Sequence, residues 1–208
     1  ARRPNSALVG VTSPFSFGQF TVYEGRTSYT LVSASISNYF EELRTDVEGA
    51  YYGFYFMDLA NYYAREANDE TLLLKLLYQT FRALVNTRIP NRLIRYIYEL
   101  KVISINGEGP QVFECIGCGD REQEKVFSIR RCGLLCRQCA AHVTDGRKLS
   151  ASTLYAMQYI IASPVEKLYT FLVKEDVLKE LGDVVTAYMA EYLGKSFKSL
   201  EILETLIM

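Results

Sequence analysis

Two short cysteine motifs, Cys115-Ile116-Gly117-Cys118 and Cys136-Arg137-Gln138-Cys139, stand in the second half of the chain. Seventeen residues separate them, a spacing that is typical of zinc sites. Each motif bends the backbone so that two thiolates face one ion, and two motifs together complete a tetrahedron of four sulfur ligands. Because four protein ligands leave no open position on the metal, the pattern predicts a structural zinc site rather than a catalytic one.

Alternatives to this ligand set remain open. Two disulfide or redox-active pairs would show the same spacing, and Cys132 makes the number of cysteines odd. Cys132 precedes Cys136 by four residues and could replace one ligand, while His142 follows Cys139 by three and could replace another. More often, such a cysteine is a small buried apolar residue and such a histidine lies outside the ligand set.

Composition limits the possible functions. The chain has 208 residues, of which 49% are hydrophobic, with 16 Tyr, 11 Phe and no Trp, so we expect a sizeable core built on mid-sized aromatic rings. No hydrophobic run approaches the roughly 18 residues of a membrane helix, which predicts a soluble protein without a membrane partner. A formal net charge of −1 means that nucleic-acid binding would depend on local basic patches.

The first part of the chain is predicted to be β structure and the rest helical. Residues 17–23 and 29–36 are expected to form strands across a turn at Glu24-Gly25-Arg26, and an isolated hairpin is marginal in water, so a larger sheet is expected. From residue 41 the hydrophobic period is that of helices. Thr45 and Glu48 form a capping-box pattern before an aromatic stripe that we interpret as core rather than as a base-stacking platform. The stripe consists of Tyr52, Tyr55, Phe56, Leu59, Tyr62 and Tyr63.

Further helices are predicted along the rest of the chain. They cover about 70–85, the stretch from Pro90 to near Gly107, a helix capped by Ser152, one begun by a capping box at 163–166, about 175–192, and about 199–206. The zinc module, at about 112–145, is inserted between these helices. The predicted fold class is therefore α+β, mostly α.

The order of these parts and a set of short motifs resemble the family of the bacterial DNA repair and recombination protein RecO. The motifs are Ala-Arg-Arg-Pro at 1–4, Phe-Gly-Gln-Phe-Thr-Val-Tyr at 17–23, Tyr-Glu-Leu-Lys at 98–101, Leu-Cys-Arg-Gln-Cys-Ala at 135–140, Ala-Ser-Pro at 162–164 and Phe-Lys-Ser-Leu-Glu at 197–201. The resemblance covers nearly the whole chain. It implies a partial OB-type β-barrel at 1–38 and a helical domain at 39–208 with the zinc module inserted in it.

The barrel implied by this resemblance is incomplete. An OB barrel normally has five strands, and this sequence begins after the family's first two strands and most of the third. The missing strands could have been cut, be disordered or come from another chain. Cys132 is a second departure, since it stands where the family often has Gly.

The resemblance implies a non-enzymatic recombination mediator in DNA repair. Such proteins bind single- and double-stranded DNA, anneal complementary strands, and help to load a recombinase together with the partner RecR. They also bind the acidic C-terminal tail of single-stranded DNA-binding protein. A bacterial, cytoplasmic and nucleoid-associated location follows from that role.

Two other functions compete with the mediator. A zinc-stabilised helical protein-interaction module with little DNA affinity would suit the net charge of −1. A metalloenzyme is disfavoured, because four thiolates leave no vacancy and the chain has one His and no phosphate-loop or nucleophile motif.

Two groups of basic residues are candidates for anion binding. Arg2 and Arg3, and Arg130 and Arg131 in the zinc module, are the candidate DNA contacts; the alternative for the first pair is a solvated terminal charge. The module's other basic residues are Arg137, Arg147 and Lys148.

The second group lies in the helical part of the chain. Arg92, Arg95 and Lys198 resemble positions of the family's tail pocket, where a cationic rim would bind carboxylates above an apolar floor. The alternative is a solvated helix face for the series Arg82, Arg88, Arg92, Arg95 and Lys101.

Overall fold

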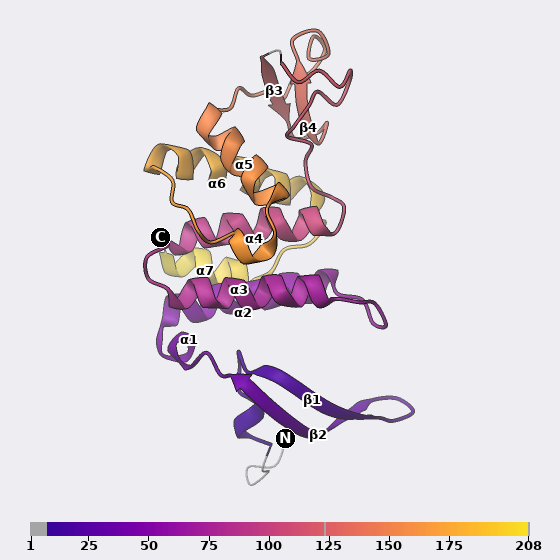
Figure 1. The fold of residues 1–208 in the computed structure, drawn as a ribbon, viewed down its shortest axis with the longest axis vertical. Coiled ribbons are helices and arrows are strands. Elements are labelled where there is room, and N and C mark those ends of the chain that lie inside the picture. The colour runs from indigo at the N-terminus through magenta and orange to yellow at the C-terminus, as the bar shows by residue number, and fades with distance from the viewer. Residues whose placement is uncertain (1–7, 123, 208) are drawn as a thin grey trace.

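A stack of helices forms most of the molecule, with a small β element at each end (Figure 1). The computed structural model describes residues 8–122 and 124–207. In chain order the elements are η1 (Gly10–Thr12, a 3-10 helix), β1 (Phe17–Glu24), β2 (Tyr29–Asn38), α1 (Glu41–Thr45), α2 (Val47–Tyr63), α3 (Thr71–Val85), α4 (Asn91–Ile105), β3 (Lys125–Ser128), β4 (Gly133–Cys136), α5 (Ala151–Ala162), η2 (Val165–Lys167, a 3-10 helix), α6 (Glu175–Tyr192) and α7 (Lys198–Ile207). The predicted α+β class, mostly α, is confirmed. None of the described helices combines the length and hydrophobicity that crossing a membrane requires.

The N-terminal strands form a two-stranded antiparallel sheet in which Phe20 lies opposite Ala34. Both predicted strands are confirmed. Over residues 8–122 and 124–207 this region contributes no further strand, so the predicted OB-type barrel is not confirmed. Large hydrophobic side chains remain exposed on the hairpin, among them Val22, Tyr23 and Val32.

The base of the hairpin joins the helical core through aromatic rings. Phe15 packs edge-on against Phe81 of α3, with ring centroids 5.4 Å apart, and Phe17 packs against Tyr78 of the same helix at 4.5 Å. Phe40, just after β2, also contacts Phe81 at 5.4 Å. Aromatic residues on both sides of residue 38 therefore share one core.

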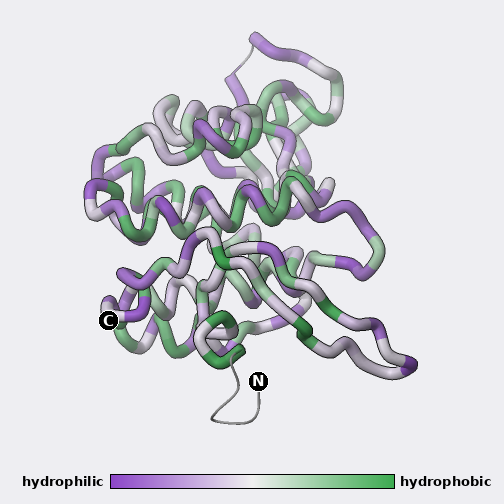
Figure 2. Tube along the Cα trace, turned by 60° about the horizontal axis from the view of Figure 1, so that its bottom comes forward, coloured by the Kyte–Doolittle hydropathy of each residue, from purple (hydrophilic) through white to green (hydrophobic). Residues whose placement is uncertain are grey.

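Helix α4 lies at the centre of the stack, in contact with α2, α3, α5 and α6 (Figure 1). All residues from Leu93 to Ile103 are buried, including the charged Arg95, Glu99 and Lys101. Other helices bury one side only, and hydrophobic and hydrophilic segments alternate along them in Figure 2. The alternative of a solvated helix face is thus wrong for Arg95 and Lys101.

The buried Lys101 ammonium is satisfied by the end of another helix. Its Nζ donates to the carbonyl oxygens of Ile161 and Ser163, at 2.8 and 2.7 Å, where α5 ends. These carbonyls carry the partial negative charge of a helix C-terminus, which stabilises a cation there. Burial lowers the pKa of Lys101, and the carbonyl contacts compensate for the lost hydration.

The predicted aromatic stripe lies in the core, as expected. Its six residues all lie on the side of α2 that packs into the core. The hydroxyl of Tyr98 on α4 donates to the carbonyl of Phe56 at 2.8 Å. Several predicted helix starts differ, however. Helix α2 begins at Val47 without a side-chain cap, because the Thr45 hydroxyl instead donates to the Glu42 carbonyl and ends α1.

Helix α5 is capped by Ser150, not by the predicted Ser152. The Ser150 hydroxyl accepts a hydrogen bond from the Thr153 backbone N–H at 3.1 Å, while Ser152 lies exposed inside the first turn. The predicted capping box at 163–166 gives only the three-residue η2, without a side-chain cap. Ser163 is held in extended backbone, as expected before a proline.

The two serines give a matched test of this cap. We expect Ser150→Ala to lower the free energy of unfolding by about 1 kcal/mol, because it removes the acceptor for an orphan helix N–H. Ser152→Ala should change it by less than about 0.5 kcal/mol, since Ala favours helices and this hydroxyl caps nothing. Urea unfolding of both variants measures the difference, and equal losses would contradict the assigned cap.

Candidate functional site

The four predicted cysteine ligands converge at the end of the molecule beyond α4. Cys115 and Cys118 lie in the turn that precedes β3, Cys136 ends β4, and Cys139 lies in the turn that follows. All four Sγ atoms lie within 4.8 Å of one another, and those of Cys118 and Cys136 are 3.7 Å apart. A tetrahedron with metal–sulfur bonds of about 2.3 Å has edges of about 3.8 Å. The four thiols therefore lie close enough to bind one metal ion.

Backbone N–H groups and neighbouring thiols shift the pKa values of the clustered cysteines. Although burial opposes it, N–H groups of Cys136, Gly117 and Cys118 lower the pKa of the Cys115 thiol to about 6. Contact with the thiols of Cys136, Cys115 and Cys118 raises the pKa of Cys139 to about 12. Four thiolates this close repel one another unless a cation lies between them, and such soft sulfur ligands suit zinc-like ions.

Cys132 and His142 lie outside this cluster. Cys132 adopts a left-handed backbone with φ of 57° in the turn between β3 and β4, a conformation that favours glycine. Its thiol donates to the Tyr192 hydroxyl at 2.8 Å, which in turn donates to the carbonyl of Ile129 at 2.7 Å. His142 is exposed and belongs to no candidate metal cluster of the described residues. All five cysteines are free thiols.

The short antiparallel strands β3 and β4 attach the cysteine cluster to the helices. Successive side chains of a strand point to opposite faces. Accordingly, Leu134 packs into the main core together with Phe127, while Leu135 packs with Cys115 and Cys136. Neither strand was predicted from the sequence.

The turn between β3 and β4 presents the candidate DNA contacts Arg130 and Arg131. Asp145 holds this turn, since its carboxylate accepts from the Ser128 hydroxyl at 2.7 Å and from the Arg130 N–H at 3.0 Å. Although partial burial opposes it, these bonds lower the pKa of Asp145. Both arginine side chains are therefore exposed on a turn of fixed shape.

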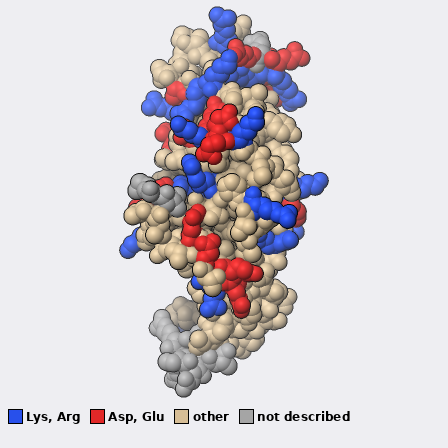
Figure 3. Space-filling model, turned by 90° about the vertical axis from the view of Figure 1, so that its left-hand side faces the viewer, with Lys and Arg blue, Asp and Glu red and all other residues tan. Residues whose placement is uncertain are grey.

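Two further arginines share this property. Arg137 and Arg147 are exposed, and like Arg130 and Arg131 they form no ion pair with any carboxylate of residues 8–122 and 124–207. By contrast, Arg121 pairs with Glu114 and Lys148 with Glu124. Basic side chains gather at this end of the molecule in Figure 3. Arg2 and Arg3 lie outside the described residues.

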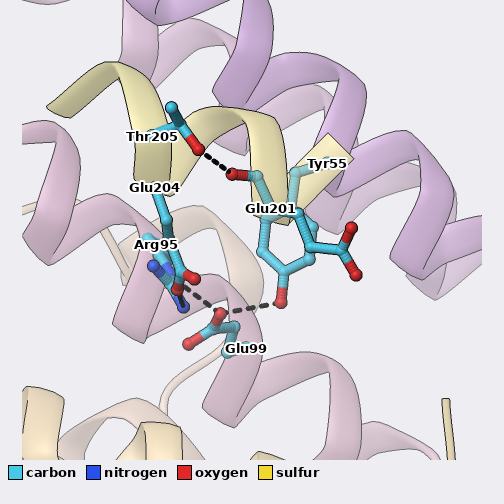
Figure 4. Close-up of polar contacts among 6 residues, drawn as sticks. All are labelled: Tyr55, Arg95, Glu99, Glu201, Glu204 and Thr205. Atoms are coloured by element: carbon cyan, nitrogen blue, oxygen red, sulfur yellow. Dashed lines mark hydrogen bonds and ion pairs between the residues drawn. The ribbon is translucent and has the colours of Figure 1, made fainter. Parts of the chain in front are cut away.

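The predicted tail residue Arg95 is buried and already paired. Its Nε donates to Glu99 Oε1 at 2.8 Å, and its Nη2 pairs with Glu204 of α7 at 3.2 Å (Figure 4). The Tyr55 hydroxyl also donates to Glu99 Oε1, at 2.7 Å. Burial raises the pKa of Glu99, while Arg95 and Tyr55 oppose that shift by stabilising the carboxylate. The other carboxylate oxygen, Oε2, is buried with no hydrogen-bond partner among the described residues.

A cavity of about 220 Å³ opens beside this pair, between α4, α6 and α7. Arg95, Glu99 and Glu204 contribute to its wall, together with the apolar side chains of Met189, Leu193, Phe197 and Leu200. The predicted combination of an arginine with an apolar floor is therefore present.

The other two predicted tail residues do not line this cavity. Arg92 is exposed with its Nη1 3.9 Å from Glu175, and Lys198 is exposed at the first position of α7. The structure thus brings one of the three predicted residues to the cavity.

The comparisons with a family model and with curated proteins agree with each other. The family model described as "Recombination protein O C terminal" matches residues 44–201. The "DNA repair protein RecO" of Acetivibrio thermocellus is 34% identical over 208 residues, which is 99% of this chain and 82% of that protein. Proteins of the same name from Alkaliphilus metalliredigens and Halalkalibacterium halodurans are each 29% identical, over 97% and 99% of this chain and over 83% and 81% of their own lengths.

The buried pair of Arg95 and Glu99 can be tested against an exposed pair. We expect Glu99→Leu to destabilise the fold by about 3 kcal/mol or more, because it leaves a buried guanidinium without its main partner. The double variant Arg95→Met/Glu99→Leu should recover part of this loss, since apolar side chains can replace a buried pair. Urea unfolding of the single and double variants measures both effects.

The control is the exposed pair of Arg92 and Glu175. Arg92→Met, Glu175→Leu and their double variant should each stay within about 1 kcal/mol of the unmodified chain. A loss after Glu99→Leu as small as in this control would contradict the structural weight given to the buried pair.

Proposed function

The chain belongs to the RecO family of DNA repair proteins, and on that basis we propose that it is a non-enzymatic DNA-binding mediator of recombination. In this role it anneals complementary single strands and helps to load a recombinase together with RecR. It works on strands coated by single-stranded DNA-binding protein, inside the bacterial cytoplasm at the nucleoid. No bond is made or broken by the chain.

The segment that holds the four clustered cysteines, β3 and β4 is called the cysteine module. Its exposed arginines that form no ion pair among the described residues support the DNA-binding part of this proposal. Annealing requires that phosphate charge is neutralised so that two backbones can approach, and that contacts are loose enough for bases to find partners. Arg130, Arg131, Arg137 and Arg147 offer guanidinium groups that form no ion pair with a carboxylate of the described residues, although Asp145 and Glu124 act electrostatically on Arg130 and Arg137. Such a patch supports backbone contact, which is independent of sequence, in a chain of net charge −1.

We further propose that Cys115, Cys118, Cys136 and Cys139 hold one zinc ion in a structural role. The ion would supply the positive charge that four close thiolates need, and it would fix the turns on both sides of β3 and β4. Ligand exchange with substrate is not expected, because all four positions on the metal are taken by sulfur.

The acidic tail of single-stranded DNA-binding protein is proposed to bind at the cavity beside Arg95. An apolar side chain of the tail would enter between Met189 and Leu200, and a carboxylate would reach the guanidinium. Arg92, in the first turn of α4, and Lys198, the first residue of α7, are both exposed and would attract the tail at longer range.

A second candidate function is a zinc-stabilised helical interaction module with little DNA affinity of its own. The net charge of −1 favours it. It shares the zinc site and the tail-binding cavity with the first proposal, and differs in predicting no strand annealing.

The proposed mediator function is tested by annealing of complementary oligonucleotides coated with single-stranded DNA-binding protein, with and without this chain, over a series of salt concentrations. We expect acceleration at low salt that declines as salt rises, because released counterions drive phosphate contacts. No acceleration at low salt would contradict the mediator. Retained binding of the acidic tail in that case would favour the interaction module.

Arginine variants locate the DNA contact. Arg130→Ala/Arg131→Ala should lower the slope of log affinity for single-stranded DNA against log salt by about 1.4, since two phosphate contacts are lost. The matched control is Arg44→Ala/Arg82→Ala, which removes the same charge from exposed positions on α1 and α3. An equal change in both double variants would show a general charge effect and contradict the assigned surface.

The metal proposal is tested by mercurial titration with a zinc indicator. We expect one equivalent of zinc to be released from the chain as isolated, and zero would refute the site. Cys118 is an exposed ligand, and the Cys118→Ser variant should release less than about half of that amount of zinc, because one of the four ligands is lost. Cys132→Ser should retain the full equivalent, because that thiol contacts Tyr192 and not the cluster.

A further inference from the structure

Two carboxylates from different helices hold the guanidinium of Arg95, and they differ greatly in exposure. Glu99 lies one turn further along the same helix with a side chain 1% exposed, whereas Glu204 reaches over from α7 with a side chain 49% exposed. Glu99 is therefore a fixed part of the core. Glu204 lies at the surface end of the pair, where water can replace it.

The orientation of Glu204 is specific within its helix. Figure 4 shows its carboxylate turned towards Arg95, while the carboxylate of Glu201, one turn earlier, points the other way. Helix α7 is anchored independently, since Leu203 is fully buried and the Ser199 hydroxyl donates to Asp58 of α2 at 2.6 Å. The Glu204 side chain can thus leave Arg95 while α7 stays in place.

The place that Glu204 occupies is also the place where an external carboxylate would bind. Arg95 and Glu204 both line the cavity with the apolar floor described above. A ligand with an acidic group and an apolar side chain would meet Glu204 on the buried guanidinium of Arg95 in that wall.

We infer that Glu204 is a built-in competitor that occupies the carboxylate position on Arg95 and is displaced when an acidic peptide tail binds the cavity. This inference rests on the tail-binding site proposed above. The exchange leaves Arg95 paired throughout, because the carboxylate of the ligand takes the position that Glu204 leaves. A tail without a carboxylate does not compete with Glu204 for Arg95, so Glu204 weakens the binding of acidic ligands and leaves the binding of neutral ligands unchanged.

The test measures peptide binding by fluorescence anisotropy with a labelled Asp-Asp-Asp-Asp-Phe peptide that has a free C-terminal carboxylate. We expect Glu204→Gln to bind it roughly two- to fivefold more tightly than the unmodified chain, as follows from the small strength of a half-exposed ion pair. Glu201 also lines the cavity but forms no ion pair with Arg95, so Glu201→Gln removes the same charge from the same wall and serves as the matched control for a general charge effect. An Asn-Asn-Asn-Asn-Phe peptide with an amidated end controls for the apolar part, and its affinity should not change.

The outcomes separate the inference from the function on which it rests. Equal affinities of the unmodified chain and Glu204→Gln, or an equal gain in Glu201→Gln, would overturn the competitor while leaving the tail site intact. Failure of every variant to bind the acidic peptide would overturn the tail site and the competitor together. Thermal unfolding of each variant checks that the fold is retained, as expected for changes at exposed carboxylates.

Discussion

Burial of helix α4 on all sides is the constraint on which the rest of the structure depends. A buried helix that carries charges needs polar partners from every side, since an unpaired buried charge is strongly destabilising. Arg95 and Glu99 receive them from α2 and α7, and Lys101 receives them from the end of α5. Each of these helices is thus held to α4 by a specific polar contact as well as by apolar packing. The motif at 98–101 is one of the six on which the family resemblance rests, and these contacts explain its charged residues Glu99 and Lys101.

The cysteine module continues this core rather than standing apart from it. Val112 and Phe127 are fully buried, and the Gln158 side chain of α5 donates to the Val112 carbonyl at 2.6 Å. Tyr192 at the end of α6 meets the turn that carries Cys132. A metal bound by the four thiols would therefore fix a turn that is already attached to two helices. This explains how the backbone of the turn can have a fixed shape although the arginine side chains that it carries are exposed.

Sequence reasoning predicted the elements well and the fate of individual polar residues less well. The cysteine cluster, the aromatic stripe and both hairpin strands depend on local spacing, and each lies where it was expected. The predicted cap of α5 was wrong by two residues, because Ser150 and Ser152 carry the same side chain and the sequence does not distinguish them. The pairing of Arg95 with Glu204 joins residues 109 positions apart, so no local pattern could reveal it. The strands β3 and β4, of four residues each, are too short for a period to stand out.

The two kinds of arginine in this chain imply two kinds of anion binding. The arginines of the cysteine module that form no ion pair among the described residues are exposed, so their proposed contact with phosphates would weaken steeply as salt rises. Arg95 is buried and already paired, so the proposed exchange of a peptide carboxylate with Glu204 would add no counterion release. An apolar contact in the adjoining cavity would be affected little by salt. In the proposed function, a chain of net charge −1 would separate salt-sensitive binding of DNA at one end from less salt-sensitive binding of an acidic peptide in its helical stack.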